Sequence, residues 1–205
     1  MFHDSIQRDS IRALYLARPT RRIMVFVDGE NLVFRFQEML RQGYVPREGL
    51  FHEPDVAVWD PSFTYLAHFH EILRVTYYTY VVGDEARLNS VREILRGLTF
   101  MKHMASLLPT HLTPCVFKKD AKSRSNKGVD IKLCVDVLGH VYRGNTDAIL
   151  LMSGDGDYEP LIEEVSRAGV QVFLSAFSKG LNPRLRHMVD ELYELDGTTW
   201  KEKPA

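Results

Sequence analysis

The sequence contains little cysteine and no long apolar segment. Its two cysteines, Cys115 and Cys134, lie in apolar stretches without the CxxC spacing of a zinc site. A disulfide-rich secreted fold is excluded on the same ground, so we expect the reducing cytoplasm as the location. The longest apolar runs, such as IMVFV and AILLM, are far shorter than the roughly 20 residues that cross a membrane. Charged and polar residues interrupt the amino-terminal segment where a secretory signal would be apolar, and we therefore expect a soluble protein with no membrane partner.

An excess of charge of either sign is also missing. The 26 Lys and Arg residues are matched by 27 Asp and Glu residues, which leaves a formal net charge of -1. This balance argues against indiscriminate binding of polyanions. It does not report how charges cluster, and acids and bases are segregated along this chain. With 205 residues, of which 45% are hydrophobic, the sequence is long enough for one well-buried domain.

The chain does contain an alternation of apolar, β-branched runs with segments of helical periodicity. This pattern is typical of βαβ units around a parallel sheet. We expect strands at 23–27, 75–82, 111–117, 148–153, 170–176 and 191–195. We expect helices at 31–42, 62–73, 84–107, 128–143, 158–168 and 181–187. Pro114 has no N–H to donate, which predicts either an edge position for its strand or an irregularity in it.

These elements predict one domain at residues 22–196. A helical extension at 1–21 precedes it and a charged tail at 197–205 follows it. Residues 43–61 are broken by proline and glycine and are long for a connection, so we interpret them as an insertion loop. The extension is not needed by the core, and docking on the sheet and a homodimer both remain open.

Acidic residues follow two of the predicted buried strands and open one predicted helix. Asp28 ends the first strand in VDGEN, Asp155 and Asp157 follow the fourth in SGDGD, and Asp130 opens a helix in KGVD. The carboxyl ends of parallel strands meet at one edge of a sheet, so we expect these four carboxylates to converge there. Clustered carboxylates repel one another, and their coexistence indicates a cation. Oxygen ligands favour Mg²⁺ or Mn²⁺, ions that activate water against phosphodiesters.

Each of these acids also has a simpler interpretation. Asp-Gly is ordinary turn chemistry, and Asp is a preferred helix N-cap. Asp136 lies six residues after Asp130, not the three or four that would place both on one helix face. We therefore expect Asp136 in a structural or supporting position.

Three motifs resemble the NYN domain family, a branch of the PIN-like nuclease superfamily. They are VDGEN at 27–31, KGVDIKLCVDVL at 127–138 and GNTDAILLMSGDGDYEPLIEEVSRAGVQVFL at 144–174. The motifs occur in the family's order, and the resemblance spans about residues 22–196.

This resemblance implies an α/β fold, namely a PIN-like Rossmannoid three-layer sandwich with a central, mainly parallel sheet. It also implies an Mg²⁺- or Mn²⁺-dependent ribonuclease with metal-binding catalytic acids and a polar residue in support. The implied catalytic residues are Asp28, Asp130, Asp155, Asp157 and Asn31. Asp136 and Ser153 are expected beside the metal ligands rather than among them.

A polar loop rich in cationic residues leads directly to Asp130. Its cationic residues are Lys118, Lys119, Lys122, Arg124 and Lys127. Such a run is commonly only a solvated loop. Its place beside the acids favours contact with an RNA backbone, and we expect Lys127 to reach the scissile region.

Two aromatic residues fall on the predicted first helix. Phe34 and Phe36 are two positions apart, so we expect them on different sides of the helix, with at least one in the core.

The favoured function is therefore cytoplasmic endoribonuclease activity. The alternative from another class is a catalytically weak or inactive RNA-binding or regulatory module of the same fold. Nothing in the sequence reads a 2′-hydroxyl, so a DNA substrate stays open. A phosphatase of the haloacid-dehalogenase type is disfavoured, because Glu30 and Asn31 replace the second acid of its DxD motif and the residue after it.

Overall fold

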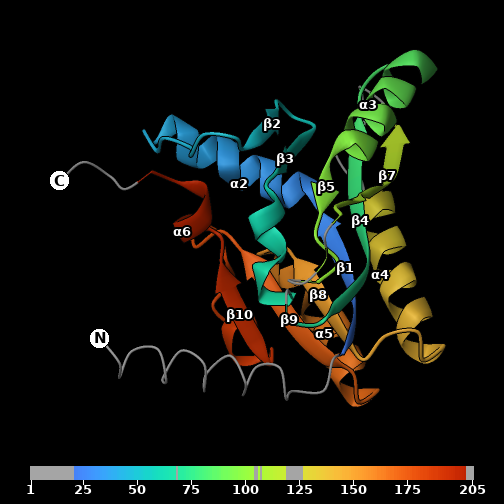
Figure 1. Ribbon diagram of the computed structural model, residues 1–205. Helices are drawn as coiled ribbons and strands as arrows, with labels where there is room; N and C mark the ends of the chain where they lie inside the picture. Colours follow the sequence, from blue (N-terminus) through green and yellow to red (C-terminus); the bar gives the residue numbers. More distant parts are fainter. Residues whose placement is uncertain (1–20, 68, 104–105, 107, 119–126, 202–205) are drawn as a thin grey trace.

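The computed structural model describes residues 21–67, 69–103, 106, 108–118 and 127–201 (Figure 1). Nearly all of the expected extension at 1–21 lies outside these residues, as do positions 119–126 of the basic loop and 202–205 of the tail.

A six-stranded sheet lies at the centre of the fold. Its strands, all paired in parallel, run in the order β10-β9-β8-β1-β4-β7. Their bounds are β1 (Arg22–Asp28), β4 (Glu71–Val81), β7 (Thr113–Lys118), β8 (Ala148–Met152), β9 (Gln171–Ala176) and β10 (Glu191–Glu194). The expected α/β fold with a parallel sheet is confirmed. β7 forms one edge, which agrees with the presence of Pro114 in this strand.

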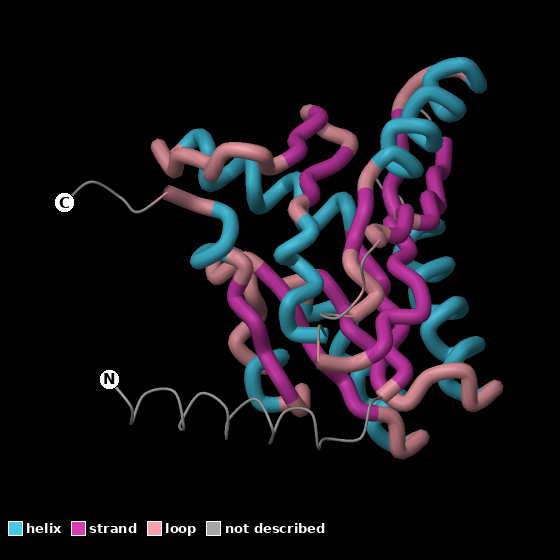
Figure 2. The backbone as a smooth tube through the Cα atoms, in the orientation of Figure 1, coloured by secondary structure: helices cyan, strands magenta, loops and turns pink. Residues whose placement is uncertain are grey.

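Helices cover both faces of this sheet, as Figure 2 shows in cyan around the magenta strands. On one face lie α2 (Gly29–Arg41) and α3 (Glu85–Gly97), and on the other lie α4 (Lys127–Tyr142) and α5 (Glu159–Arg167). The alternation of side chains along β1 explains the two cores. Ile23, Val25 and Val27 enter one apolar cluster, whereas Met24 and Phe26 enter the other. A central strand buried on both faces reads as a continuous apolar run, as IMVFV does.

Residues 43–61 are more regular than the sequence suggested. They contain an antiparallel hairpin of β2 (Phe51–Glu53) and β3 (Ala57–Trp59). All three residues of β3 are buried against the α2 side of the sheet. The strands are too short for a clear period-2 pattern, and the interpretation as an irregular loop is wrong at this point.

Two predicted helices are shorter than expected. The segment at 62–73 forms only a 3₁₀ helix, Pro61–Ala67, because β4 already begins at Glu71. The helix expected at 84–107 ends at Gly97, where β5 (Thr99–Phe100) pairs with β6 (Thr110–His111). Ile72 and Phe100, which lie beyond these two ends, are instead buried in β4 and β5.

The carboxyl-terminal elements also differ in detail. The short helix expected at 181–187 is limited to a 3₁₀ turn, Leu185–His187. The segment predicted as a tail begins within α6 (Asp196–Thr199) and continues to Trp200, whose indole stacks on Phe36 at 4.9 Å between ring centroids. Packing of the domain therefore extends past residue 196.

None of the helices in the described parts of the chain is both long enough and apolar enough to cross a membrane.

Candidate active site

The crevice between the carboxyl ends of β1 and β8 is the point where the chain reverses its direction across the sheet. From β1 the chain continues outward through β4 to β7, and it then returns to the other side of β1 with β8. Ligands of open α/β sheets bind at such a switch point. Asp28 ends β1 and Ser153 follows β8, so both residues lie in this crevice.

Asp28 is buried at the floor of the crevice, with 4% of its surface exposed. Its Oδ1 accepts a hydrogen bond from the Asn31 backbone N–H at 3.1 Å, and its Oδ2 accepts one from the Ser153 hydroxyl at 2.8 Å. Burial raises the pKa of Asp28 to about 7, against the lowering effect of these two hydrogen bonds. The carboxylates of Asp130 and Asp155 raise it further. Burial disfavours the charged form of this carboxylate, and a cation bound nearby would stabilise that form.

The partners of Asp28 also connect the two strand ends. The Asn31 side-chain oxygen accepts from the Gly154 backbone N–H at 3.1 Å, and the Ser153 hydroxyl oxygen accepts from the Asp155 N–H at 3.1 Å. A single network therefore fixes the loop after β1 against the loop after β8.

The glycines of SGDGD allow a third loop to approach. A Cβ atom on Gly154 would lie 2.9 Å from the carbonyl oxygen of Gly180, and one on Gly156 would lie 1.9 Å from the Asn182 amide nitrogen. The Asn182 backbone N–H donates to the Gly154 carbonyl at 2.9 Å. These glycines therefore let the SGDGD loop pack directly on the loop that follows β9.

The remaining three predicted acids lie at the rim and are exposed. Asp155 accepts from the Asp157 backbone N–H at 3.0 Å, so it caps the 3₁₀ turn Gly156–Tyr158. Asp130, in the first turn of α4, accepts from the Tyr158 hydroxyl at 3.4 Å. Partial burial raises the pKa of Asp130, as does the negative charge of Glu30.

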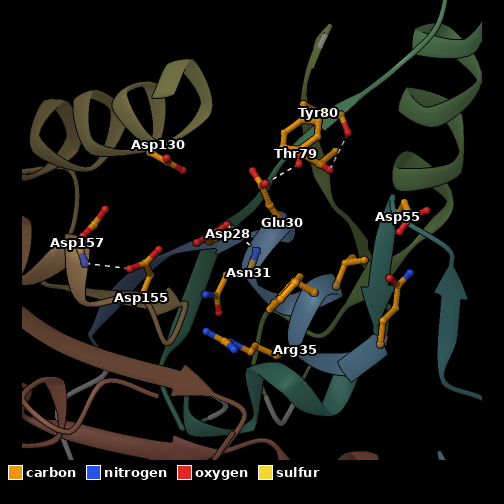
Figure 3. A pocket seen from close by; sticks show the side chains of 13 residues that line it. Asp28, Glu30, Asn31, Arg35, Asp55, Thr79, Tyr80, Asp130, Asp155 and Asp157 are labelled. Atoms are coloured by element: carbon orange, nitrogen blue, oxygen red, sulfur yellow. Dashed lines mark hydrogen bonds between the residues drawn. The ribbon is translucent and has the colours of Figure 1, made fainter. Parts of the chain in front are cut away.

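These residues line a cleft of about 560 Å³ (Figure 3). The cleft brings together all four predicted acids and adds two acids that sequence reasoning missed, Glu30 and Asp55. A groove of about 870 Å³ lies between α4 and α5 and shares Asp130, Asp155 and Asp157 with the cleft. The rim acids thus stand where two concavities meet.

Several lining residues were not found from the sequence. Glu30 lies within VDGEN, and its position next to Asp28 and Asn31 in this motif was the sequence signal that could have identified it. Its carboxylate accepts a hydrogen bond from the Tyr80 hydroxyl at 2.5 Å. Asp55 comes from the turn of the β2–β3 hairpin and has a positive φ of 57°. No local pattern indicates that this turn reaches the cleft. Arg35, on α2, also lines the cleft.

Other predicted residues lie elsewhere. Asp136 accepts from the Tyr78 hydroxyl at 2.8 Å and pairs with Lys132, and it does not line the cleft. Lys118 is exposed at the end of β7. Lys119, Lys122 and Arg124 lie outside the described residues, and of Lys127 only the backbone, at the start of α4, is described.

The donor chemistry of the cleft fits Mg²⁺ or Mn²⁺, because its acids offer oxygen ligands only. The spacing is looser than the sequence suggested. Across the described residues, no three His, Cys, Asp or Glu side chains are arranged to hold one ion. The four acids therefore share a cleft but do not meet at one point. Mg²⁺ is commonly held by one or two carboxylates together with water and substrate phosphates, and these residues can supply that number.

An acid-lined crevice at the switch point of a parallel sheet is the usual place of a ligand site in an α/β protein. The family model of the NYN domain matches residues 22–196, and the chain belongs to this family. NYN domains have a PIN-like nuclease fold, are generally nucleases and typically use divalent metals.

A solved structure has the same fold. It is the crystal structure of a protein of unknown function from Vibrio parahaemolyticus RIMD 2210633, with a TM-score of 0.58 and 19% sequence identity. The similarity covers 89% of this chain and 97% of the other. Comparison with curated proteins gives no match.

Proposed function

We propose that the protein is a divalent-metal-dependent endoribonuclease that hydrolyses RNA phosphodiester bonds. The observation that carries the proposal is the cleft itself, in which the acids of all three NYN motifs lie around the buried Asp28. Asp28, Asp130, Asp155 and Asp157 are the proposed metal-binding and catalytic residues. Bound Mg²⁺ or Mn²⁺ would supply Lewis-acid activation of water and charge neutralisation at the phosphate.

The protein's own contribution is preorganisation. Both oxygens of Asp28 are already fixed by Asn31 and Ser153, so its carboxylate needs no reorientation when charge develops nearby. Asp155 is held through its own cap and through Ser153, which sets the position of the opposite wall. We assign Asn31 and Ser153 as positioning residues. Asp136 is assigned a structural role through Tyr78.

We propose cleavage within the RNA chain because the concave surface extends to both sides of the rim acids. The cleft beside α2 and the groove beside α4 meet at the three rim acids, which leaves concave surface on both sides of them. A strand can lie across such a site with nucleotides on either side of the scissile bond. The basic residues from Lys118 to Lys127, which precede Asp130 in the sequence, are proposed to contact the RNA backbone.

The test is cleavage of labelled linear and circular single-stranded RNA with Mn²⁺, Mg²⁺ or EDTA, with DNA of the same sequence in parallel. We expect the protein to open the circular RNA when Mn²⁺ or Mg²⁺ is present. We expect no opening in EDTA, and none with the Asp28→Asn or Asp155→Asn variant. Cleavage that persists in EDTA or in both variants would overturn the metal mechanism. Preference for DNA would correct the substrate class.

A second candidate is an RNA-binding module without activity. The observation in its favour is the spacing of the acids, since no three of the candidate ligand side chains in the described residues are arranged to hold one ion. Tight RNA binding with no cleavage in any metal would establish this candidate. A cytoplasmic location, the extension at 1–21 and a homodimer through it remain predictions, and the mass in solution tests the last.

A further inference from the structure

One side of α2 forms part of the cleft wall. Phe34 lines the cleft and is 53% exposed, whereas Phe36, two residues later, is fully buried. The expectation that the two rings divide between different sides of the helix agrees with these exposures. An apolar ring that is left open on a cleft wall offers a flat surface to a ligand.

Arg35 is held beside this ring. Its guanidinium carbon lies 5.1 Å from the centroid of Phe34, and its Nη1 donates to Glu38 Oε2 at 3.0 Å. In Figure 3 the Arg35 side chain extends on the same side of α2 as Asn31, toward the loop that carries Asp155. Asn31 and Arg35 are four residues apart, so both lie on one helix face, about 6 Å apart along the axis.

The loop after β9 limits where Arg35 can move. A Cβ atom on Gly180 would lie 2.0 Å from Arg35 Nε, and Gly180 has a φ of +81°. Arg35 Nε is buried under this backbone and finds no hydrogen-bond partner in the described structure. The guanidinium is therefore preset at the cleft wall by Glu38, Phe34 and Gly180 together.

The acidic lining of the cleft makes the positive charge of Arg35 a candidate binding site for phosphate. Among the described lining residues it is the single cationic side chain, against six carboxylates. A nucleic-acid strand that enters this cleft brings phosphates, which the acids repel and a guanidinium binds in a bidentate manner. A metal at the acids would serve the scissile phosphate, so Arg35 is placed for a neighbouring one.

We propose that Phe34 and Arg35 form a nucleotide subsite, in which Arg35 binds a phosphate adjacent to the scissile bond and Phe34 stacks on an unpaired base. This inference rests on the proposed function and names how its substrate is held. Stacking on an aromatic ring tolerates every base but needs one that is free of a duplex. The subsite therefore favours single-stranded RNA without a strong sequence preference.

The test measures binding of a fluorescent, unstructured oligoribonucleotide in EDTA and in Ca²⁺, with the RNA checked for integrity. Phe34→Leu is expected to weaken binding about ten-fold and to leave the salt dependence unchanged. Arg35→Gln is expected to weaken binding and to reduce the slope of log K against log salt by about 0.7, the value for one phosphate of a single strand. Arg35→Lys keeps the charge and should restore most of that slope.

Matched controls separate the subsite from general surface effects. Arg96 also forms an i,i+3 pair, with the preceding Glu93 on α3, and is not among the residues that line the cleft, so Arg96→Gln should bind RNA as the wild type does. Tyr142 is an exposed aromatic at the end of α4 and supports the control Tyr142→Leu. Thermal melts of all variants show whether each folds.

The outcomes distinguish this inference from the proposed function. Wild-type binding and wild-type salt slope in folded Phe34→Leu and Arg35→Gln would overturn the subsite, even if the protein cleaves RNA. Equal losses on fully paired RNA would overturn the stacking role of Phe34. If the variants lose RNA binding but the wild type cleaves no RNA, the subsite is supported and the proposed nuclease activity is refuted. A wild type that binds no RNA would overturn both.

Discussion

Ser153 donates its hydroxyl hydrogen to Asp28 at 2.8 Å, across the boundary between β8 and β1. The bond lies in a fully buried position and also joins the Asp155 backbone through the same hydroxyl oxygen. One small side chain thus holds the floor of the cleft and the start of its opposite wall.

Replacement of this hydroxyl should impair the site more than the fold. Ser153→Ala leaves a buried carboxylate oxygen of Asp28 without its hydrogen-bond donor. For such groups the free energy of unfolding falls by about 1–3 kcal/mol. We expect RNA cleavage to fall at least ten-fold in kcat, with KM changed less, because the base and phosphate contacts remain. Steady-state kinetics in Mn²⁺ measures both values.

Ser175 provides the matched control. It is fully buried on β9, in register with Met152, and its hydroxyl has no hydrogen-bond partner in the described structure. Ser175→Ala should therefore leave both stability and cleavage close to wild type. Equal activity in Ser153→Ala and Ser175→Ala would contradict the positioning role of Ser153.

The raised pKa of Asp28 predicts a specific dependence of stability on pH in the absence of metal. Between the ordinary value of 3.8 and about 7, the unfolded chain has released this proton and the folded chain retains it. Stability is therefore lost as the pH rises through this window and stays low above it. The total is on the order of a few kcal/mol.

Asp28→Asn removes this contribution. In EDTA at pH 8, we expect the variant to be more stable than the wild type, and at pH 4 we expect the two to be nearly equal. Added Mn²⁺ should raise the wild-type melting temperature at pH 8 and leave that of the variant nearly unchanged. Urea unfolding across this pH range is the measurement, and parallel curves for the two proteins would refute the assignment.

The sequence predicted best those features that depend on residues near one another in the chain. IMVFV and AILLM predicted the central strands because burial on both faces leaves no polar interruption, and Asp28 and Asp155 were found because they lie within three residues of the ends of such runs. Pro114 indicated the edge strand through its missing donor.

The rest depends on tertiary contacts that have no local pattern. Asp55 reaches the cleft only because β3 packs under α2, and Arg35 is fixed by Gly180, which is 145 positions away in the chain. Trp200 lies within the segment expected as a charged tail, yet its ring fills the space beside Phe36 and Phe177. Such positions become visible only once the sheet order is known.

The contact between the SGDGD loop and the loop after β9 predicts a strict requirement for Gly154. A Cβ there meets the Gly180 backbone at 2.9 Å, and backbone cannot rotate away as a side chain can. Gly154→Ala should cost about 1–3 kcal/mol and lower cleavage strongly, because Asp155 and Arg35 both shift. Gly139→Ala, in the last turn of α4 with its nearest contact at 3.7 Å, should instead stabilise by about 0.4–1 kcal/mol. Chemical unfolding and cleavage assays on both variants test the difference in sign.

The packing of Trp200 predicts that the folded unit needs residues beyond 196. Its indole is 5% exposed, stacks on Phe36 at 4.9 Å and contacts Tyr44 at 5.4 Å between ring centroids. Trp200→Ala should therefore lower the free energy of unfolding by about 3–5 kcal/mol, as for other buried aromatic rings. A chain that ends at residue 196 should lose at least as much, whereas one that ends at residue 201 should melt close to the full chain. Equal stability of the three proteins would show that the core is complete without this ring.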